Sequence, residues 1–266
     1  MLGDGDAVLN MSLAPVEQIR RRIQPYSRLG VHMQEASEPA LSAIAFGIRY
    51  HPHFTVGDRL GEIIDGILAT RGWEPERFPE AVAAAGSYTI MNRSTNERLT
   101  VSLTDCLLHA ELDSIAPNAI ISRAEAFASD PWDKVWKIGD HPAVTRFGCL
   151  FGFSIPDDWS PAQALLGSPE DAHSTFVLRY SHRLPVEDAV MHAEINDYKN
   201  VIYTISCLPG KRLASVDYQR YFDPMIEGND AMKKEPFAGF VRDAVRFLLG
   251  TGWKYLEERL AQAKAA

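Results

Sequence analysis

Residues 41–50 read Leu-Ser-Ala-Ile-Ala-Phe-Gly-Ile-Arg-Tyr. Large apolar side chains occupy every second position from 44 to 50, and the positions between them hold Ala45, Gly47 and Arg49. Successive side chains of a strand point to opposite faces, so this alternation predicts a strand with one buried and one wetter face.

The same reasoning, applied outward along the chain, predicts a series of strands interrupted by helices. Strands are expected at 87–91, 98–103, 106–112, 144–155, 175–184, 189–196 and 201–208. Helices are expected at 13–23, 58–70 and 122–138, and again from 237 to the C-terminal region. Because the strands form meanders rather than regular β-α-β units, we expect an α+β fold with antiparallel sheets and flanking helices.

Three local features refine this expectation. Pro131 must begin a second helical segment, because proline disrupts a helix interior. Residues 197–200 have the length of a hairpin loop. Along 144–155 the aromatic side chains fall on one side and Gly148 and Gly152 on the other. The aromatic stretch 217–222 is expected to pack the C-terminal helices on the sheet.

The composition is that of an ordinary folded chain: 266 residues, 46% apolar and 23% charged, with a net charge of −8. This acidic balance argues against nonspecific binding to nucleic acid or to anionic membranes. No apolar run is long enough to cross a membrane. The first ten residues lack the features of a signal peptide, so we expect a cytoplasmic protein. The three cysteines lack a CxxC spacing, which favours buried thiols over a disulfide framework or a zinc site.

A short internal similarity suggests a domain organisation. Residues 46–58 and 176–188 share five identities in 13 positions, at an offset of 130 residues. We therefore expect a flexible N-terminus (1–12), a first α+β half (13–140) and a second half with the C-terminal helices (141–266), the two related halves sharing a core. Convergence of two amphipathic strands is the alternative explanation.

Standard catalytic and cofactor motifs are missing from the sequence. It contains no dinucleotide-binding GxGxxG, Walker loop, HExxH or GxSxG motif. No cofactor is therefore expected, and the expectation of an enzyme is lowered.

The best candidate for a metal site is the pair His192 and Glu194, which would project from one face of a strand. A third ligand would come from His182, His51 or His53. The competing interpretation is an ordinary strand, because the apolar phase of 189–195 leaves His192 and Glu194 on the wetter face.

Two Arg-Tyr pairs are candidates for a ligand-binding groove: Arg49-Tyr50 and Arg179-Tyr180, the latter followed by His182. Arginine pairs with carboxylates, and tyrosine offers flat contact area. Alternatively, the two tyrosines complete core faces while the arginines lie in solvent.

Several segments together resemble a sporadically distributed family of uncharacterised bacterial proteins of about this length. The resemblance lies in residues 39–50, 88–92 and 176–180, and in a closing region with Val216-Asp217-Tyr218, Phe237 and Phe240. That family has no established catalytic residues, so the resemblance assigns none here. By analogy, it implies a role like that of the peptide-binding accessory proteins of ribosomal-peptide natural-product pathways.

These observations predict a non-catalytic accessory protein whose partner is a peptide or a protein. Binding would use strand addition at an open sheet edge or an inter-sheet groove, and open edges would also permit a homo- or heterodimer. The alternatives are a metal-dependent oxygenase or hydrolase using His192 and Glu194, and a nucleic-acid-associated factor that binds through the basic cluster 20–22.

Overall fold

The computed structural model describes residues 40–70, 72–75, 86–112, 116–156, 175–184, 198–208, 211–222 and 236–264. All of these residues belong to one compact unit. None of the described helices is long and apolar enough to span a membrane. The predicted helix at 13–23 and strand at 189–196 lie outside the described residues.

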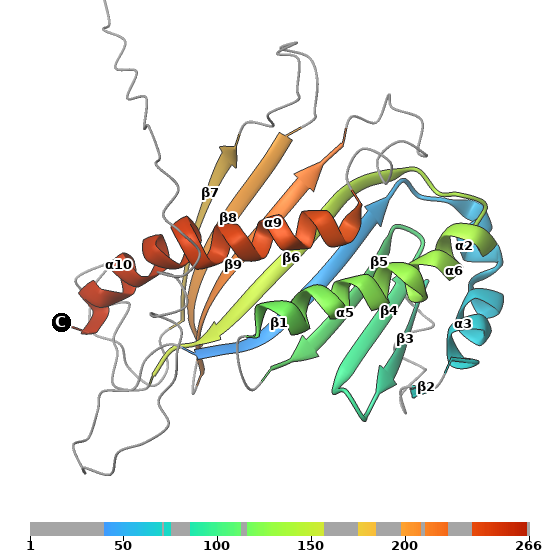
Figure 1. Cartoon of the computed structure of the whole chain (residues 1–266), viewed down its shortest axis with the longest axis horizontal. Helices are drawn as coiled ribbons and strands as arrows, with labels where there is room; N and C mark the ends of the chain where they lie inside the picture. The colour runs from blue at the N-terminus through green and yellow to red at the C-terminus, as the bar shows by residue number, and fades with distance from the viewer. Residues whose placement is uncertain are drawn as a thin grey trace, which may run out of the picture. The chain divides into compact units, whose positions relative to one another are not determined.

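The described strands form a single antiparallel sheet of nine strands (Figure 1). The antiparallel α+β class predicted from the sequence is therefore confirmed, with one sheet where several were expected. In spatial order the strands are β2 (Trp73–Pro75), β3 (Ser87–Asn92), β4 (Glu97–Ser102), β5 (Asp105–Glu111), β1 (Ala40–Tyr50), β6 (Val144–Ser154), β9 (Lys211–Tyr221), β8 (Tyr198–Leu208) and β7 (Phe176–Leu184).

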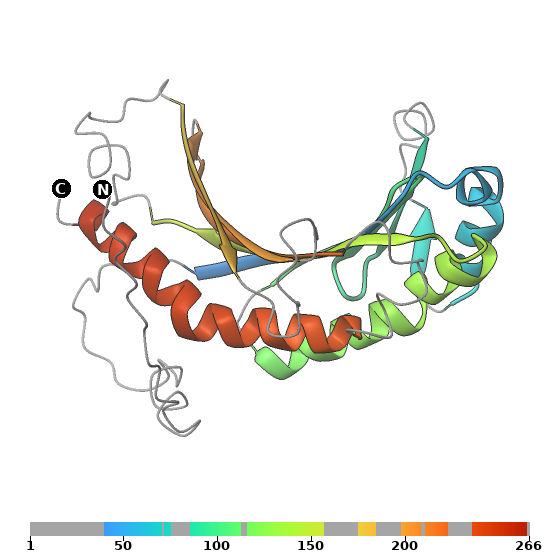
Figure 2. The same cartoon turned by 90° about the horizontal axis from the view of Figure 1, so that it is seen from above.

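The helices lie along one side of this sheet, which curves strongly and is convex towards them (Figure 2). Pro131 separates two of them, as the sequence predicted. The helices are α2 (Phe54–Asp58), α3 (Leu60–Leu68), α5 (Pro117–Ser129), α6 (Pro131–Ile138), α9 (Phe237–Phe247), the π-helical turn η1 (Leu248–Gly252) and α10 (Trp253–Lys264). No described helix lies over the concave side, which we call the uncovered face.

The core fills the space between the convex side of the sheet and the helices. Phe46 of β1 and Phe147 of β6 are fully buried there, as are Phe127 of α5 and Phe237 of α9. Ring centroids are 6.3 Å apart for Phe46 and Phe127, and 5.2 Å apart for Phe147 and Phe237. Burial of large aromatic side chains is a major stabilising term, so it fixes the helices on this side.

The strand order is similar on the two sides of the sheet centre, except that the short strand β2 adds an edge strand on one side. β1 is followed by β2 and then by the meander β3–β4–β5, whose last strand returns to pair with β1. β6 is followed by β7–β8–β9, whose last strand returns to pair with β6. The predicted 130-residue offset instead aligns β1, a central strand, with β7, an edge strand, so those two segments are not equivalent in the sheet.

Two local predictions can be compared with the described elements. The hairpin loop predicted at 197–200 is wrong for its last three residues, because Tyr198 to Asn200 form the start of β8. Tyr198 pairs with Tyr221 of β9, and their rings stack with centroids 4.7 Å apart. This cross-strand contact extends the strand. The expectation for the three cysteines is confirmed, since all are buried: Cys106, Cys149 and Cys207.

Candidate functional site

Rows of side chains run across the uncovered face, because paired residues on neighbouring strands point to the same side. One row is charged and aromatic and crosses five strands. It contains Asp105 (β5), Arg49 (β1), Arg146 (β6), Tyr221 (β9) and Tyr198 (β8). The next row places Leu107, Gly47, Gly148 and Gln219 side by side. The third row includes Ala45, Leu150 and Asp217.

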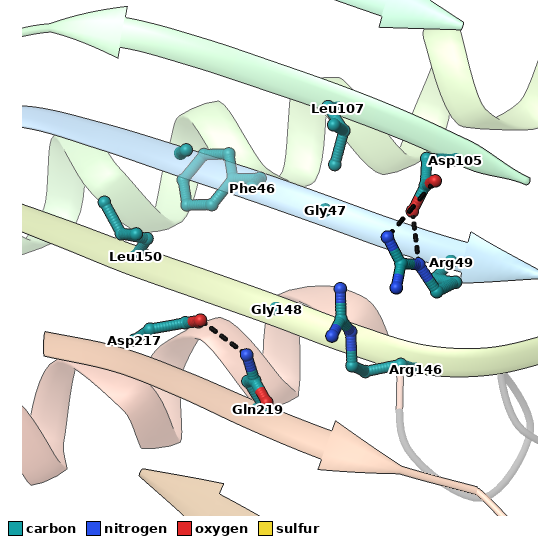
Figure 3. Close-up of a pocket in the computed structure, with 11 residues that line it drawn as sticks. Phe46, Gly47, Arg49, Asp105, Leu107, Arg146, Gly148, Leu150, Asp217 and Gln219 are labelled. Atoms are coloured by element: carbon teal, nitrogen blue, oxygen red, sulfur yellow. Dashed lines mark hydrogen bonds and ion pairs between the residues drawn. The ribbon is translucent and has the colours of Figure 1, made fainter. Parts of the chain in front are cut away.

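These rows surround a hollow of about 170 Å³ at the centre of the uncovered face (Figure 3). Gly47 and Gly148 are paired across the central strands and leave its floor without side chains. Its lining is formed by Ala45, Phe46, Gly47, Arg49, Asp105, Leu107, Arg146, Gly148, Leu150, Asp217 and Gln219. We call this feature the central hollow.

The fold does not require glycine at position 148. Its backbone lies outside the left-handed region that favours glycine. A Cβ added there would come no closer than 3.9 Å to another heavy atom, the carbonyl oxygen of Gly47. At Gly47 an added Cβ would lie 2.8 Å from Cδ2 of Leu107, the end of a half-exposed, flexible side chain. Glycine weakens a strand and often marks the close approach of a ligand or another backbone.

Two guanidinium groups lie at the same end of the central hollow (Figure 3). Arg49 forms an ion pair with Asp105, with 2.7 Å between Nε and Oδ1. Arg146 lies directly opposite Arg49 in the strand register, where like charges repel. Among the described residues, Arg146 has no carboxylate within 4.0 Å.

A chain of hydrogen bonds connects Arg146 to the opposite end of the central hollow. Arg146 Nη1 donates to the Tyr221 hydroxyl at 3.3 Å. That hydroxyl donates to Gln219 Oε1 at 2.8 Å, and Gln219 Nε2 donates to Asp217 Oδ2. Asp217, Gln219 and Tyr221 occupy alternate positions of β9 and therefore share the uncovered face. The chain holds the side chains of this wall in place.

Aromatic side chains of β9 and β8 also restrict the position of the Arg146 guanidinium group. Its guanidinium carbon lies 5.7 Å from the centroid of the Tyr221 ring. Tyr221 stacks on Tyr198, and the guanidinium of Arg183 lies 4.3 Å from the Tyr198 ring centroid. Such cation–aromatic contacts contribute about 0.5–1 kcal/mol at exposed sites. Arg146 is thus positioned by contacts with a neutral side chain.

Asp217 forms the acidic end of the central hollow. Burial raises the pKa of this carboxyl group, and the hydrogen bond from Gln219 and the charges of Arg146 and Arg179 oppose that rise. Burial disfavours the ionised form because it removes water from around the charge. The hollow therefore has a cationic end at Arg49 and Arg146 and a desolvated acidic end at Asp217.

The five residues predicted to bind a ligand do not lie on one face. Arg49 lies on the uncovered face, and so does Arg179, which pairs with Thr204 of β8. Tyr50 is buried on the helix side, where its hydroxyl donates to the carbonyl oxygen of Ser102. Tyr180 and His182 also lie on the helix side. Neighbouring residues of a strand point to opposite faces, so each Arg-Tyr pair is divided between the two sides.

Tyr180 and His182 stack on each other, with ring centroids 6.5 Å apart. Tyr180 also stacks on Tyr255 of α10, at 6.0 Å, yet keeps 47% of its surface exposed. The alternative interpretation, in which both tyrosines complete core faces, therefore describes Tyr50 alone. Tyr180 instead forms a half-exposed contact between the edge strand and α10.

The metal-site candidates His192 and Glu194 lie outside the described residues, as does the basic cluster 20–22. Within the described parts of the chain, no group of three or more His, Cys, Asp or Glu side chains could hold a metal ion. His51, His53 and His182 belong to these described parts, whereas the two principal candidates do not.

The β6 and β9 residues that line the hollow were not among the site residues predicted from the sequence. Residues 217–222 were expected to pack helices on the sheet, but only alternate residues do so. Tyr218 contacts Phe240 of α9, at 5.7 Å between ring centroids, whereas Asp217 and Gln219 line the central hollow. The polar residues Asp217 and Gln219, at alternate positions on either side of Tyr218, were the sequence signal that could have indicated this second face. The alternation of residues 144–155 predicted that Gly148 faces away from the aromatic side chains. Its pairing with Gly47 depends on the register between β1 and β6, which the local sequence does not determine.

No protein-family model matches this chain, and comparison with curated proteins finds no significant match. Functional inference therefore depends on the geometry of the uncovered face.

Proposed function

We propose that the protein is a non-catalytic accessory protein that holds a segment of a peptide or partner protein against the uncovered face. The observation that supports this proposal is the paired glycines, Gly47 and Gly148, at the centre of that face. Neither has the left-handed backbone that requires glycine. A ligand that approaches the sheet closely gives a physical reason for glycine at both positions.

The size of the central hollow favours one group of a longer ligand. Pockets that enclose a small molecule usually measure roughly 300–1,000 Å³, whereas this hollow measures about 170 Å³ and lies on an uncovered sheet face. It can receive a single side chain or a chain end. The remainder of the segment would lie along the neighbouring rows of the same face, so this face, rather than an inter-sheet groove, is the proposed binding surface.

The edge strand β7 offers a second contact for the same partner. Among the described strands it pairs only with β8, and most of its side chains are exposed, including Val177 at 62%. An exposed edge can accept an added strand through main-chain hydrogen bonds. We propose strand addition here as a supplement to the central hollow, and the partner as a peptide or protein.

We also infer that the two halves of the chain are related by duplication. The strand order around β1 and β6 supports this inference, because the last strand of the meander that follows each of them returns to pair with it; the β1 side has the short edge strand β2 in addition. Gly47 and Gly148 face each other across the junction between these halves. The central hollow therefore requires both halves.

The experiment is selection from a phage-displayed library of random dodecapeptides on the immobilised full-length protein. Selected peptides are then measured by fluorescence anisotropy against wild type, Gly148→Leu and Gly152→Leu. Gly148→Leu fills the hollow and is expected to weaken binding at least tenfold. Gly152 lies on the same strand and face but does not line the hollow, and an added Cβ there makes an ordinary 3.5 Å contact with Ala43, so it is the matched control.

Unchanged binding to Gly148→Leu, or failure to select any peptide, would contradict the proposed function. Thermal unfolding of each variant confirms that the comparison is between folded proteins.

A further inference from the structure

We propose that the group received by the central hollow is a carboxylate, bound by Arg146, and that the partner segment is therefore acidic. This inference rests on the proposed function and adds the chemistry of the ligand. The carboxylate could be the side chain of Asp or Glu, or the C-terminal carboxylate of a chain.

The first support is an imbalance of charge at one end of the central hollow. Arg49 and Arg146 are paired in the strand register, and Asp105 neutralises Arg49. Arg146 is left with the neutral hydroxyl of Tyr221 as its hydrogen-bond acceptor and, among the described residues, with no carboxylate within 4.0 Å. A bound carboxylate would give this cationic side chain an ion pair of its own.

The second support is the positioning of the Arg146 side chain. The hydrogen bond to Tyr221 uses one of the five N–H donors of a guanidinium group. The Tyr221 ring, itself stacked on Tyr198, restricts the position of the group. Figure 3 shows Arg146 beside Gly148 and on the same end of the hollow as Arg49. Because a positioned guanidinium loses little entropy on binding, it suits two-point recognition of a carboxylate.

The size and polarity of the hollow favour a carboxylate over a phosphate group. A volume of about 170 Å³ equals that of about five or six waters at roughly 30 Å³ each, enough for a carboxylate and its methylene groups. A dianionic phosphate would bring two negative charges between Asp105 and Asp217, both of which line the hollow. The net charge of −8 disfavours a nucleic-acid backbone, which is a polyanion.

More arginines on the uncovered face extend the positive surface towards the β7 edge. Arg179 and Arg183 occupy alternate positions of β7 and share that face. Among the described residues, neither has a carboxylate within 4.0 Å. These side chains would attract further acidic residues of the segment, in a chain whose overall charge is −8.

The test uses dodecapeptides selected on the wild-type protein and resynthesised in matched forms. In one form each Asp or Glu is replaced by its amide, in a second the C-terminus is amidated, and in a third a phosphoserine replaces the critical acid. We expect that replacing one carboxylate weakens binding to the wild type at least tenfold. The side-chain and C-terminal forms identify the source of that carboxylate.

The same peptides are measured against Arg146→Gln, where the acid-to-amide change is expected to alter the dissociation constant less than twofold. Arg146→Lys retains the charge without the planar guanidinium and is expected to give an intermediate dependence. Arg242→Gln, a matched substitution on the surface of α9, is expected to behave as wild type. Thermal unfolding is compared for all three variants, and Arg146→Lys provides the decisive comparison if Arg146→Gln does not fold.

Three results with the selected peptides would overturn this inference. The selected peptides could bind equally well after all carboxylates are amidated, the acid dependence could persist in Arg146→Gln, or phosphoserine could bind more tightly than the acid. Binding that is lost in Gly148→Leu but shows no dependence on acid would overturn this inference alone and leave the proposed function standing. Failure to select any peptide would overturn both.

Discussion

Replacing Gly148 by alanine is expected to stabilise the fold while weakening binding at the central hollow. The nearest heavy atom to an added Cβ is the Gly47 carbonyl oxygen at 3.9 Å, so the methyl group meets no obstacle. Glycine in a strand costs about 0.5–1 kcal/mol relative to alanine, mainly because the unfolded chain loses more entropy on folding. The free energy of unfolding should therefore rise by about 0.5–1 kcal/mol.

Equilibrium unfolding in urea, followed by tryptophan fluorescence, measures this change directly. For a folded region of this size, 1 kcal/mol corresponds to about 2–4 °C in the melting temperature, so a rise of about 1–4 °C is expected. Affinity for the selected dodecapeptides should fall in the same variant, because the methyl group occupies the floor of the hollow. Higher stability with lower affinity is the combined result that the structure predicts.

Gly139→Ala is the control for the method. An added Cβ at Gly139 would overlap the carbonyl oxygen of Val135 and lie 2.7 Å from Cγ2 of Val56. Since a backbone atom cannot move aside easily, this substitution should destabilise the protein by about 1–3 kcal/mol. If Gly148→Ala were also destabilising by more than about 0.5 kcal/mol, the fold itself would require this glycine and the reasoning from it to a ligand would be refuted.

Three further predictions follow from the core and from the acidic end of the hollow. Phe147→Ala should lower the free energy of unfolding by about 3–5 kcal/mol, because the ring is fully buried against Phe222 and Phe237; a loss below about 1 kcal/mol in urea unfolding would contradict this packing. Burial raises the pKa of Asp217 above its ordinary value of 3.8. The protonated carboxyl group therefore contributes most to the stability of the fold at a pH below 3.8, and this contribution is lost as the pH rises through the pKa of the folded state. The free energy of unfolding of Asp217→Asn, minus that of the wild type, should therefore increase as the pH rises over this range. A difference that does not change with pH would refute the raised pKa of Asp217. Ellman's reagent should not react with the three buried cysteines in the native protein and should react with all of them in denaturant: Cys106, Cys149 and Cys207. Rapid labelling of any of them in the native protein would contradict this prediction.

Local patterns in the sequence predicted several individual elements but not β9, since only residues 217–222 of that segment drew a prediction, as a stretch that packs the C-terminal helices on the sheet. The alternation from Ile44 to Tyr50 predicted β1 and its buried face, and Pro131 predicted the boundary between α5 and α6. The same alternation also implied that Arg49 and Tyr50 would point to opposite sides. One groove cannot hold both members of such a pair, and the predicted binding residues are therefore divided between the two faces.

The central hollow could not be predicted, because it depends on pairings between distant segments. Gly47 meets Gly148 only after β1 pairs with β6, and Asp217 reaches Leu150 only after β9 pairs with β6. A shift of one residue in either register would move every side chain of that strand to the other face. The sequence contains the alternating polar positions of β9, but nothing local to that segment indicates its neighbour.

The position of the central hollow also indicates which molecule, the protein or its partner, loses conformational entropy on binding. β1 and β6 are each paired on both sides, and buried aromatic rings of α5 and α9 pack behind them. A site on such a rigid support needs little rearrangement, so the partner segment would lose most of the conformational freedom. At the β7 edge, by contrast, support comes from β8 on one side only among the described strands. Substitutions in the central hollow should therefore change affinity mainly through lost contacts, whereas substitutions along β7 should also change it through the order of the strand itself.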